Sequence, residues 1–403
     1  HLDLLVGTLG GPVKLWRGDG RGRFEDATAQ LGLDGTTWAA TALALADVDE
    51  DGDLDLYVGT YKTRNALDAY PPQDRSFEQV VRRIGNKYRV VPAWEKEYRI
   101  EDRPDLGGIM RSQRAEPDLF LINEGRGRFR REPIAGAAGS ARFRDDRGRP
   151  LREEPDYFTL AARFHDVNAD GAPDLYVCND FEDPDQLWLN DGTGGFRLAP
   201  ALALRQTSNT CMSVDFADVN RDGHVDFFTA DMASPSHARR QTQFPVNTPI
   251  PKRVGLDTAR QQWMRNALQL GRGDGTWAEA AMFAGVEASE WTWGSAFTDV
   301  NLDGWEDLLV VNGHRWDVRD ADTFERIRNA FPRVAWNREQ GEFPRHAARS
   351  MAFANRARDG TFADRSAEWH FGDTPAITNG IALADLDGDG DQDVVTTRLG
   401  DTP

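Results

Sequence analysis

One nine-residue acidic pattern, Asp-x-Asp/Asn-x-Asp-Gly-x-x-Asp, occurs five times in this chain, at residues 47–55, 166–174, 218–226, 299–307 and 385–393. Oxygen ligands at alternate positions of a short loop, followed by a glycine and a further carboxylate, are what a hard cation such as Ca²⁺ requires. The alternative is a set of solvated acidic turns that bind no metal. Because five copies of so specific a spacing are hard to explain as turns alone, we interpret them as about five calcium sites.

We expect each loop to bind through side-chain oxygens at positions 1, 3, 5 and 9. The backbone carbonyl at position 7, where the residue type varies freely, would complete the set. Loop by loop, the residues at these five positions are Asp47, Asp49, Asp51, Asp53, Asp55; Asp166, Asn168, Asp170, Ala172, Asp174; Asp218, Asn220, Asp222, His224, Asp226; Asp299, Asn301, Asp303, Trp305, Asp307; and Asp385, Asp387, Asp389, Asp391, Asp393.

The residue at position 12 distinguishes these loops from EF-hands. An EF-hand places a bidentate Glu there and flanks its loop with helices. Here the residue is β-branched in every copy, namely Val58, Val177, Thr229, Val310 and Thr396. Each lies in a short apolar run, such as LDLYVGT, that is typical of a strand. The last side-chain ligand is therefore the Asp at position 9, where the strand begins.

A second pattern, a ten-residue segment, recurs at a nearly constant distance from the acidic loops. Ten-residue segments at 15–24, 120–129, 187–196, 268–277 and 353–362 each end in an aromatic residue, which lies 23, 37, 22, 22 and 23 residues before the next acidic loop. Such constancy indicates one repeated unit. Each unit reads as a small-residue strand, the acidic loop, a β-branched strand and a hairpin of two further strands. We name these strands A, B, C and D in chain order.

Four antiparallel strands per repeat, with glycine at the turns, predict an all-β fold and specifically a β-propeller with acidic A–B loops. The small residues of strand A suit the crowded inner position of a blade. The chain would hold strands B to D of one blade, four complete blades and strands A and B of another, as one domain over 1–403. Because radial closure requires more blades, we expect this to be a fragment of a longer chain.

The loops followed by Asp-Leu-Tyr-Val resemble FG-GAP or VCBS repeats, the units of integrin α-subunit propellers. The segments LWLNDGTGGF, DMASPSHARR, EASEWTWGSAF and VVNGH resemble more closely the proteins related to cartilage acidic protein, which often carry an ASPIC/UnbV domain. The resemblance covers essentially the whole chain. It implies a seven-bladed, calcium-binding, exported protein, located outside the cell, at the cell surface or in the periplasm. It implies little about activity and no catalytic residue.

Long insertions interrupt the repeats at about 61–116, 134–156, 232–266 and 312–350. They fall in B–C or D–A connections, which leave an antiparallel blade at the end opposite its A–B loop. We therefore expect all four on the face opposite the calcium loops. A capping-box match beginning at Ser76 predicts a helix through Ile84, and a second helix is predicted from Asp322 to Phe331.

Charge separates the insertions from the rest of the chain. The net charge of the whole is −18, which argues against a nucleic-acid partner. The insertions carry 31 Lys and Arg but 21 Asp and Glu, and they hold aromatic residues, such as Tyr70 and Tyr98, that we expect to be exposed. Arg and aromatic side chains dominate recognition surfaces, which indicates an anionic glycan or an acidic protein as ligand. No apolar run reaches the ~20 residues that cross a bilayer, so no transmembrane segment is predicted.

We predict a calcium-binding, exported module for binding or adhesion, acting on glycan or protein ligands through the insertion-bearing face. One alternative is a polysaccharide lyase or hydrolase with its site on one face of the propeller, around His314, Arg315 and Trp316. Another is a structural subunit of a surface assembly. Cys178 and Cys211 could form one disulfide, although two buried thiols are the favoured interpretation.

Overall fold

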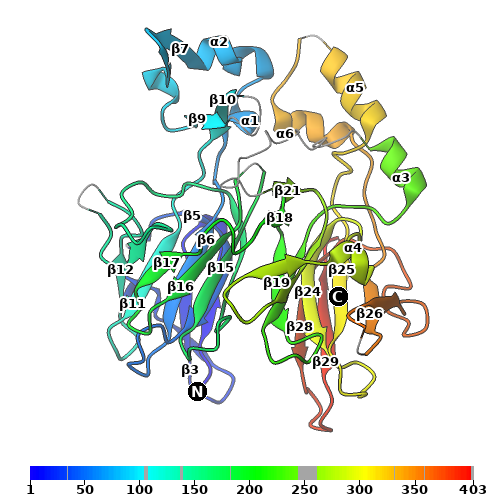
Figure 1. Cartoon of the computed structure of the whole chain (residues 1–403). Coiled ribbons are helices and arrows are strands. Elements are labelled where there is room, and N and C mark those ends of the chain that lie inside the picture. The colour runs from blue at the N-terminus through cyan, green and yellow to red at the C-terminus, as the bar shows by residue number, and fades with distance from the viewer. Residues whose placement is uncertain are drawn as a thin grey trace. The chain divides into compact units, whose positions relative to one another are not determined.

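The computed structural model describes residues 1–33, 35–103, 108–136, 139–181, 183–243, 261–330, 332–357 and 359–400. The chain divides into two compact units (Figure 1). Unit 1 consists of His1–Thr63, Ala115–Leu204 and Arg272–Thr276. Unit 2 consists of Arg64–Arg114, Arg205–Gly271 and Trp277–Pro403.

Unit 1 is built from three sheets, which are antiparallel except at one edge strand. The first contains β1 (Leu4–Val6), β3 (Lys14–Gly18) and β4 (Phe24–Asp26). The second contains β5 (Trp38–Ala46), β6 (Asp55–Thr60), β11 (Leu119–Asn123) and β12 (Phe129–Glu132), with β2 (Leu9–Gly11) added beside β5. The third contains β14 (Thr159–His165), β15 (Asp174–Asn179), β16 (Gln186–Asn190) and β17 (Phe196–Leu198), with β13 (Phe143–Arg144) added beside β17. A 3-10 helix, η1 (Thr28–Leu31), follows β4.

Unit 2 repeats the same strand order. One sheet contains β19 (Ser213–Ala217), β20 (Asp226–Ala230), β22 (Ala267–Gly271) and β23 (Trp277–Glu279). The next contains β24 (Thr292–Thr298), β25 (Asp307–Asn312), β26 (Met351–Asn355) and β27 (Phe362–Asp364). The last pair is β28 (Thr378–Ala384) and β29 (Asp393–Arg398). The predicted A-B-C-D order is therefore found in four sheets. The β1-β3-β4 sheet and the β28-β29 pair match the two incomplete repeats.

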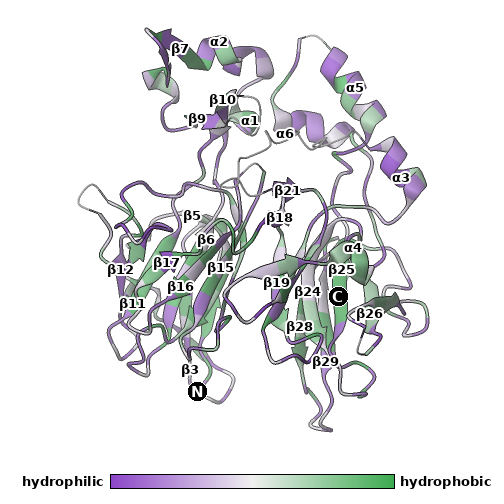
Figure 2. Cartoon of the chain, in the orientation of Figure 1, coloured by the Kyte–Doolittle hydropathy of each residue, from purple (hydrophilic) through white to green (hydrophobic). Residues whose placement is uncertain are grey.

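The strands take these positions because of their side chains. Strands β6, β15, β20 and β25 are buried along their whole length, as their β-branched and aromatic residues require. The small-residue strands lie side by side, β14 against β5 in unit 1 and β24 against β19 and β28 in unit 2. Figure 2 shows hydrophobic residues concentrated in the strands of each unit. This all-β arrangement is consistent with a propeller-like fold, whereas one ring over 1–403 stays a prediction.

Aromatic residues fill the sheet interfaces within each unit. In unit 1, Phe120, Phe143 and Phe196 pack edge to face or stacked, with ring centroids 5.1 to 5.7 Å apart. In unit 2, Phe228 packs against Phe297 at 6.5 Å. Cys178 and Cys211 are buried thiols, as the favoured interpretation expected.

The insertion at about 61–116 folds on a small core of its own, made by Ala66, Val80, Val81 and Tyr98. Tyr98 is 2% exposed, so the expectation that it lies at the surface is wrong, whereas Tyr70 is 42% exposed. The elements here are α1 (Ala66–Ala69), η2 (Pro72–Arg75), α2 (Phe77–Val80), β7 (Val81–Ile84), β8 (Lys87–Val90), η3 (Pro92–Trp94), β9 (Tyr98–Arg103) and β10 (Gly108–Gln113).

The helix predicted from Ser76 through Ile84 is wrong in its second half. Ser76 makes no side-chain capping bond, and the helix ends at Val80. Residues Val81–Ile84 pair with β8, and Gly85 makes the hairpin turn with a φ of 62°. The β-branched residues of this segment favour a strand once a partner strand follows within hairpin distance.

The remaining elements lie in the later insertions, except β18 and α4, which lie between repeats outside them. These are β18 (Gln206–Ser208), α3 (His237–Thr242), β21 (Gln261–Trp263), α4 (Ala281–Ala284), α5 (Ala321–Asn329), α6 (Trp336–Glu339) and η5 (Gln340–Glu342). The helix predicted at 322–331 is confirmed as α5, but it begins earlier, because Asp320 caps it by accepting the Thr323 N–H at 2.8 Å. Phe331, its predicted last residue, lies outside the described residues.

The insertion at about 134–156 corrects one expectation about placement. Its strand β13 runs parallel to β17 along the edge of the third sheet of unit 1. Arg142 then reaches Asp49 in the first acidic loop, with 3.3 Å from Nη2 to Oδ2. This insertion therefore extends to the loop end of the sheets in its unit, and not only to the opposite end, because its residues add an edge strand.

Candidate functional site

Four of the acidic loops share one internal hydrogen-bond pattern, whereas in the fifth loop Asp385 accepts the N–H groups of Gly388 and Gly390 instead. The position-1 carboxylate of Asp47 accepts the N–H of Asp51 with one oxygen and the N–H of Gly52 with the other, at 3.1 and 2.9 Å. Asp166, Asp218 and Asp299 repeat both bonds at the same positions of their loops. Each loop is thus folded around its first aspartate by local contacts alone.

Position 4 of four loops holds a residue with left-handed backbone. The residues are Glu50, Ala169, Arg221 and Leu302, with φ between 56 and 60°. The fifth loop has Gly388 there, at 78°. A non-glycine residue in this region costs roughly 1–2 kcal/mol, so the loops hold a strained turn that turns their oxygens inward.

These turns bring predicted ligands together. One carboxylate oxygen from each of Asp47, Asp49 and Asp51 lies within 4.8 Å of the others, and the same holds for Asp385, Asp387 and Asp393. In the three middle loops position 3 is Asn, and Asn168 accepts the Asp170 N–H at 2.9 Å. Clustered hard oxygens on a glycine-containing turn fit Ca²⁺. A bound calcium ion would neutralise the converging carboxylates of the loop.

The position-9 aspartate has a second role that the sequence did not reveal. Asp55 is fully buried, and its Oδ1 accepts the N–H of Asn123 at 2.8 Å while its Oδ2 accepts the N–H of Val48 at 3.2 Å. Asp174, Asp226 and Asp307 make the same pair of bonds to their own loop and their own strand C. Each position-9 carboxylate therefore joins loop to sheet, and its remaining lone pairs are what a cation could use.

The buried position-9 carboxylates have raised pKa values. Burial raises the pKa of Asp55 and Asp307 to about 6, and that of Asp174 and Asp226 to about 7. Their backbone hydrogen bonds oppose this shift, whereas the neighbouring loop carboxylates add to it.

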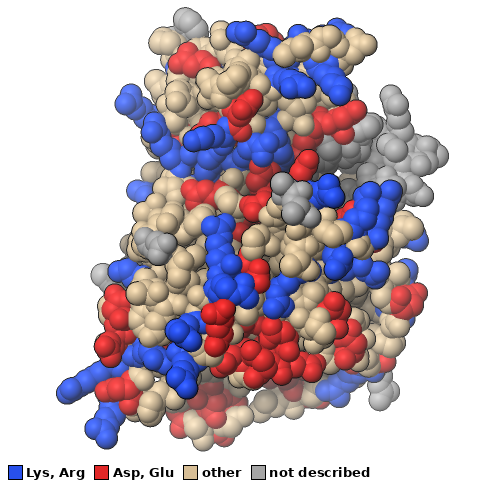
Figure 3. All heavy atoms as spheres, turned by 90° about the vertical axis from the view of Figure 1, so that its left-hand side faces the viewer, with Lys and Arg blue, Asp and Glu red and all other residues tan. Residues whose placement is uncertain are grey.

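Figure 3 shows acidic side chains gathered into a continuous area in the lower part of the face that it draws. Like charges held this close are destabilising until a counter-charge is present.

An asparagine at the end of strand C links successive loops. In unit 1, the Nδ2 of Asn190 donates to the carbonyl of Pro173 in its own loop and to that of Val48 in the preceding loop, at 3.2 and 2.9 Å. In unit 2, Asn355 repeats this arrangement with Glu306 and Val219. The spacing of the loops does not predict this link, although Asn recurs at this place in the ten-residue segments.

At the ends of the strands opposite the acidic loops, the far ends, buried aspartates accept hydrogen bonds from the neighbouring strand. In unit 1, Asp118 accepts hydrogen bonds from the Tyr57 hydroxyl and the Thr60 N–H, and Asp185 does the same for Tyr176 and Asn179. Each of these aspartates directly precedes strand C. The shared Pro-Asp before the third strand, in EPDLFLIN and DPDQLWLN, was the signal that sequence reasoning missed.

Unit 2 gathers charged side chains at the far ends of its strands. Arg239 of α3 donates through Nε to Glu290 at 3.1 Å and through Nη2 to Asp317 at 2.9 Å. The same Nη2 lies 2.9 Å from Nδ1 of His346. Because an arginine can only donate, Nδ1 of His346 accepts, and the neutral ring carries its proton on Nε2. Burial, with Arg239 beside the ring, lowers the pKa of His346 to about 4, so the ring is neutral near pH 7.

The three residues expected around an enzyme site are divided between two places. His314 stacks on Trp291, with ring centroids 4.1 Å apart and 10° between the planes, and it is partly buried. Arg315 lies over Trp316 at 5.4 Å, and both line a cavity of about 390 Å³ with Arg345. The stacking of His314 is what a structural histidine would show, whereas Arg315 and Trp316 face solvent-accessible space.

Two segments, residues 1–58 and 166–229, match the model of the FG-GAP-like repeat. They include the first three acidic loops together with the strands that follow them. The chain therefore contains FG-GAP-like repeats, as the resemblance of its loops predicted. A search among curated proteins finds no match. No helix in the described ranges has the length and apolar character needed to cross a bilayer.

Two of the solved structures that match this chain show low identity to it. A lectin of Agrocybe aegerita that recognises non-reducing terminal N-acetylglucosamine is 14% identical, with 90% of this chain and 75% of that chain covered and a TM-score of 0.30. A rhamnogalacturonan lyase of Bacillus licheniformis is 11% identical, with 98% and 66% covered and a TM-score of 0.35. Similarity of this degree carries no argument about function.

Proposed function

We propose that this protein is a calcium-stabilised β-propeller that is exported and binds glycan or protein ligands through the far ends of its strands. The acidic loops would hold the calcium ions and stabilise the fold. The connections at the opposite ends of the strands would meet the ligand. The seven-bladed form, the closer kinship with ASPIC/UnbV proteins and an extracellular, cell-surface or periplasmic location are further parts of the proposal.

The observation that carries the calcium part is the shared geometry of the loops. All five loops have left-handed backbone at position 4, in four of them at a non-glycine residue, and four make the same hydrogen bonds to their position-1 aspartate. Residues at positions 1, 3 and 5 would hold the ion, while the position-9 carboxylate ties the loop to the sheet. When bound, calcium supplies positive charge to a cluster whose members otherwise repel one another, and its binding energy adds to the stability of the fold.

The binding part is supported by the distribution of charged side chains. Loops at one end of each sheet are committed to internal hydrogen bonds. The far ends in unit 2 instead carry arginine, histidine and carboxylate groups beside cavities of about 420 and 390 Å³. Such cavities fall within the range of ~300–1,000 Å³ typical of small-molecule sites.

Thermal unfolding with and without calcium tests the first part. At free calcium about 100 times its dissociation constant, each occupied site contributes about 2.7 kcal/mol, so EDTA should lower Tm markedly. Asp51→Asn should reduce this calcium-dependent increase in Tm. Glu50→Gln is the matched control, because it removes one charge from the same loop at a position that we do not assign as a ligand. An unchanged Tm in EDTA would refute structural calcium.

A glycan array, with analysis of the supernatant, tests the second part. Retention of glycans without shortened or unsaturated products would support a binding module. Release of such products would instead establish a lyase or hydrolase. Absence of any glycan or protein ligand would contradict the binding role while leaving the calcium part to the unfolding experiment.

A further inference from the structure

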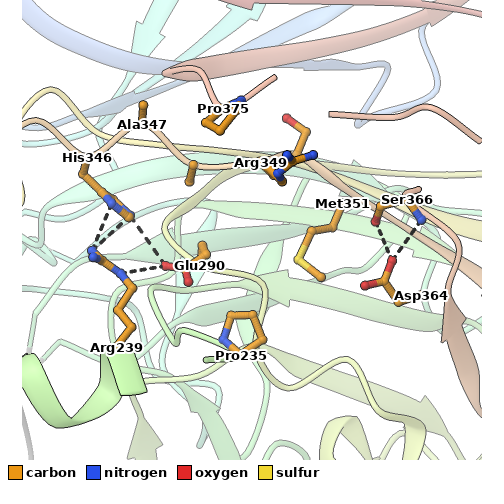
Figure 4. A pocket seen from close by; sticks show the side chains of 12 residues that line it. Pro235, Arg239, Glu290, His346, Ala347, Arg349, Met351, Asp364, Ser366 and Pro375 are labelled. Atoms are coloured by element: carbon orange, nitrogen blue, oxygen red, sulfur yellow. Dashed lines mark hydrogen bonds and ion pairs between the residues drawn. The ribbon is translucent and has the colours of Figure 1, made fainter. Parts of the chain in front are cut away.

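A cavity of about 420 Å³ lies at the far ends of the strands in unit 2, between α3, the start of β24 and the start of β26. Figure 4 shows its two polar groups on opposite sides of the view, Arg239 with Glu290 and His346 on one side and Asp364 with Ser366 on the other. Met351 and Arg349 lie between them. The cavity therefore combines polar ends with a partly apolar middle, as small-ligand sites do.

The first polar end is rigidly built. Glu290 adopts a φ of 75°, which is unfavourable for a residue with a side chain. Its Oε1 accepts from the Ser234 hydroxyl, and its Oε2 accepts from Arg239. Backbone strain of this kind persists where surrounding contacts over-determine it, and it is concentrated at binding and catalytic sites. These groups are fixed before any ligand arrives.

The charged groups at this end are also already paired. The Arg239 guanidinium is paired with both Glu290 and Asp317, and His346 is neutral. Among the residues that line the cavity here, the charges of Arg239 and Glu290 cancel, whereas Asp317 lies outside the lining and adds one negative charge to the group. The lining at this end therefore offers oriented hydrogen-bonding groups whose own charges cancel.

The second end keeps hydrogen-bonding capacity open. Oδ1 of Asp364 accepts both the N–H and the hydroxyl of Ser366, at 2.9 and 2.6 Å, whereas Oδ2 accepts from no group in the described part of the chain. The exposed guanidinium of Arg349 has no carboxylate within 4.0 Å among the described residues. One free acceptor and one free set of donors thus face the same cavity.

The lining charges cancel, with two arginines against two carboxylates. A ligand that carries donors and acceptors on every polar atom satisfies both ends, and hydroxyl groups do so. The apolar surface of Met351, Pro235 and Pro375 suits the C–H face of a sugar ring. We propose that this cavity binds a neutral saccharide unit, with Arg349 and Asp364 as the ligand-contacting residues and the Arg239–Glu290–His346 group as a preorganised wall. This inference rests on the proposed binding role of the far strand ends.

Calorimetric titration of the full chain in calcium tests the cavity directly. The probes are the methyl glycosides of glucose, galactose and mannose, with glucuronate, glucose 6-sulfate and L-alanine as charged or zwitterionic comparators. We expect at least one methyl glycoside to bind with a dissociation constant on the order of 1 mM. The charged comparators should bind about tenfold more weakly. Stronger binding of alanine or glucuronate than of every glycoside would overturn the assignment.

Variants then locate the binding. Arg349→Ala and Asp364→Asn should each weaken glycoside binding about tenfold, because each removes one of the open groups. Arg338→Ala is the matched control, since Arg338 is also an exposed arginine of unit 2 but lies outside the cavity lining. Ala347→Trp should abolish binding by filling the entrance, and its exposed position keeps the core intact.

The outcomes separate this inference from the proposed function. If Ala347→Trp retains wild-type binding to array glycans, the saccharide cavity is wrong, although the far strand ends can still be the binding face. If methyl glycosides bind and Ala347→Trp abolishes it while no larger ligand is found, the cavity stands and adhesion is refuted. If no glycoside binds the wild type at 20 mM, about twenty times the expected constant, the inference fails whatever the array shows.

Discussion

The side-chain amide of Asn355 donates a 2.8 Å hydrogen bond to the carbonyl of Val219, which belongs to the acidic loop of the preceding repeat of unit 2. The same amide reaches Glu306 in its own loop at 3.2 Å. Asn355 is 5% exposed, so water cannot readily replace either bond. One side chain thereby ties two candidate calcium loops together.

Removing this amide should destabilise both loops. We expect Asn355→Ala to lower the free energy of unfolding by about 2–3 kcal/mol, because it leaves buried carbonyl groups without a donor. Denaturant titration in saturating calcium measures the change. Asn337→Ala is the control, since that asparagine is exposed on α6. Equal stability of the two variants would contradict a linking role for Asn355.

Positions 9 and 5 of a loop should respond differently to calcium. Asp307→Ala removes two buried acceptors of backbone N–H groups, so it should cost about 2–4 kcal/mol both in calcium and in EDTA. Asp303→Ala should lower stability chiefly in calcium, because its main role would be to bind the ion. The free energy of unfolding of each variant, measured in calcium and in EDTA, distinguishes a residue that ties the loop to the sheet by hydrogen bonds from one that binds the ion. An effect of Asp307→Ala that disappeared in EDTA would show that position 9 acts only through the metal.

The left-handed residue at position 4 offers a test of strain. Ala169 is exposed and has a φ of 60°, so Ala169→Gly should relieve the strain and raise stability by roughly 0.5–1 kcal/mol. Ala169→Val should lower it, since β-branched side chains fit this region poorly. Thermal unfolding of the two variants gives the sign of each change. A loss of stability in the glycine variant would mean that chain entropy outweighs the strain.

Asp118 should make stability depend on pH. Burial raises its folded-state pKa to about 6 from an ordinary value of 3.8, although hydrogen bonds from Tyr57, Thr60 and Thr159 act in the opposite direction. Between pH 3.8 and about 6, the Asp118 carboxyl is therefore protonated in the folded protein but ionised in the unfolded chain. The contribution of this group is therefore fully present below pH 3.8 and is lost as pH rises through about 6.

The comparison with Asp118→Asn isolates this effect, because the variant cannot ionise at that position while the acidic loops are unchanged. The wild type should lose stability relative to the variant between pH 4.5 and 7, by about 1–3 kcal/mol. Denaturant titrations of both proteins in the same calcium-containing buffers provide the measurement. A wild type that gained on the variant as pH rose would show that the hydrogen bonds outweigh the desolvation.

Much of the fold could be predicted because its signals are local. The acidic loops, the β-branched runs after them and the glycine-containing hairpins each lie within about ten residues, and four sheets have the predicted strand order. The segment from Val81 to Ile84 shows where local reasoning failed. A capping-box match indicated helix, but pairing with a strand that comes later in the chain decided the conformation.

The candidate site could be predicted only in part, for a related reason. The loop ligands are visible because their spacing is fixed within nine residues. The contacts of Asp118, Asn355 and Arg239 join residues 41 to 136 positions apart, so no spacing rule reveals them. The sequence placed His314 among the residues of an alternative enzyme site, but its stacking on Trp291 is a packing contact that no local pattern reveals.

The hydrogen bonds of the position-9 aspartate to its own loop and its own strand C have a consequence for how such chains can change over time. Because each loop is secured to a strand of its own repeat, a duplicated or recombined gene segment would carry both partners of that attachment with it. The connections at the other end could then lengthen, shorten or acquire new chemistry while the framework of acidic loops and strands stayed intact. A designer who wished to alter recognition could graft new segments at that end and leave every acidic turn untouched.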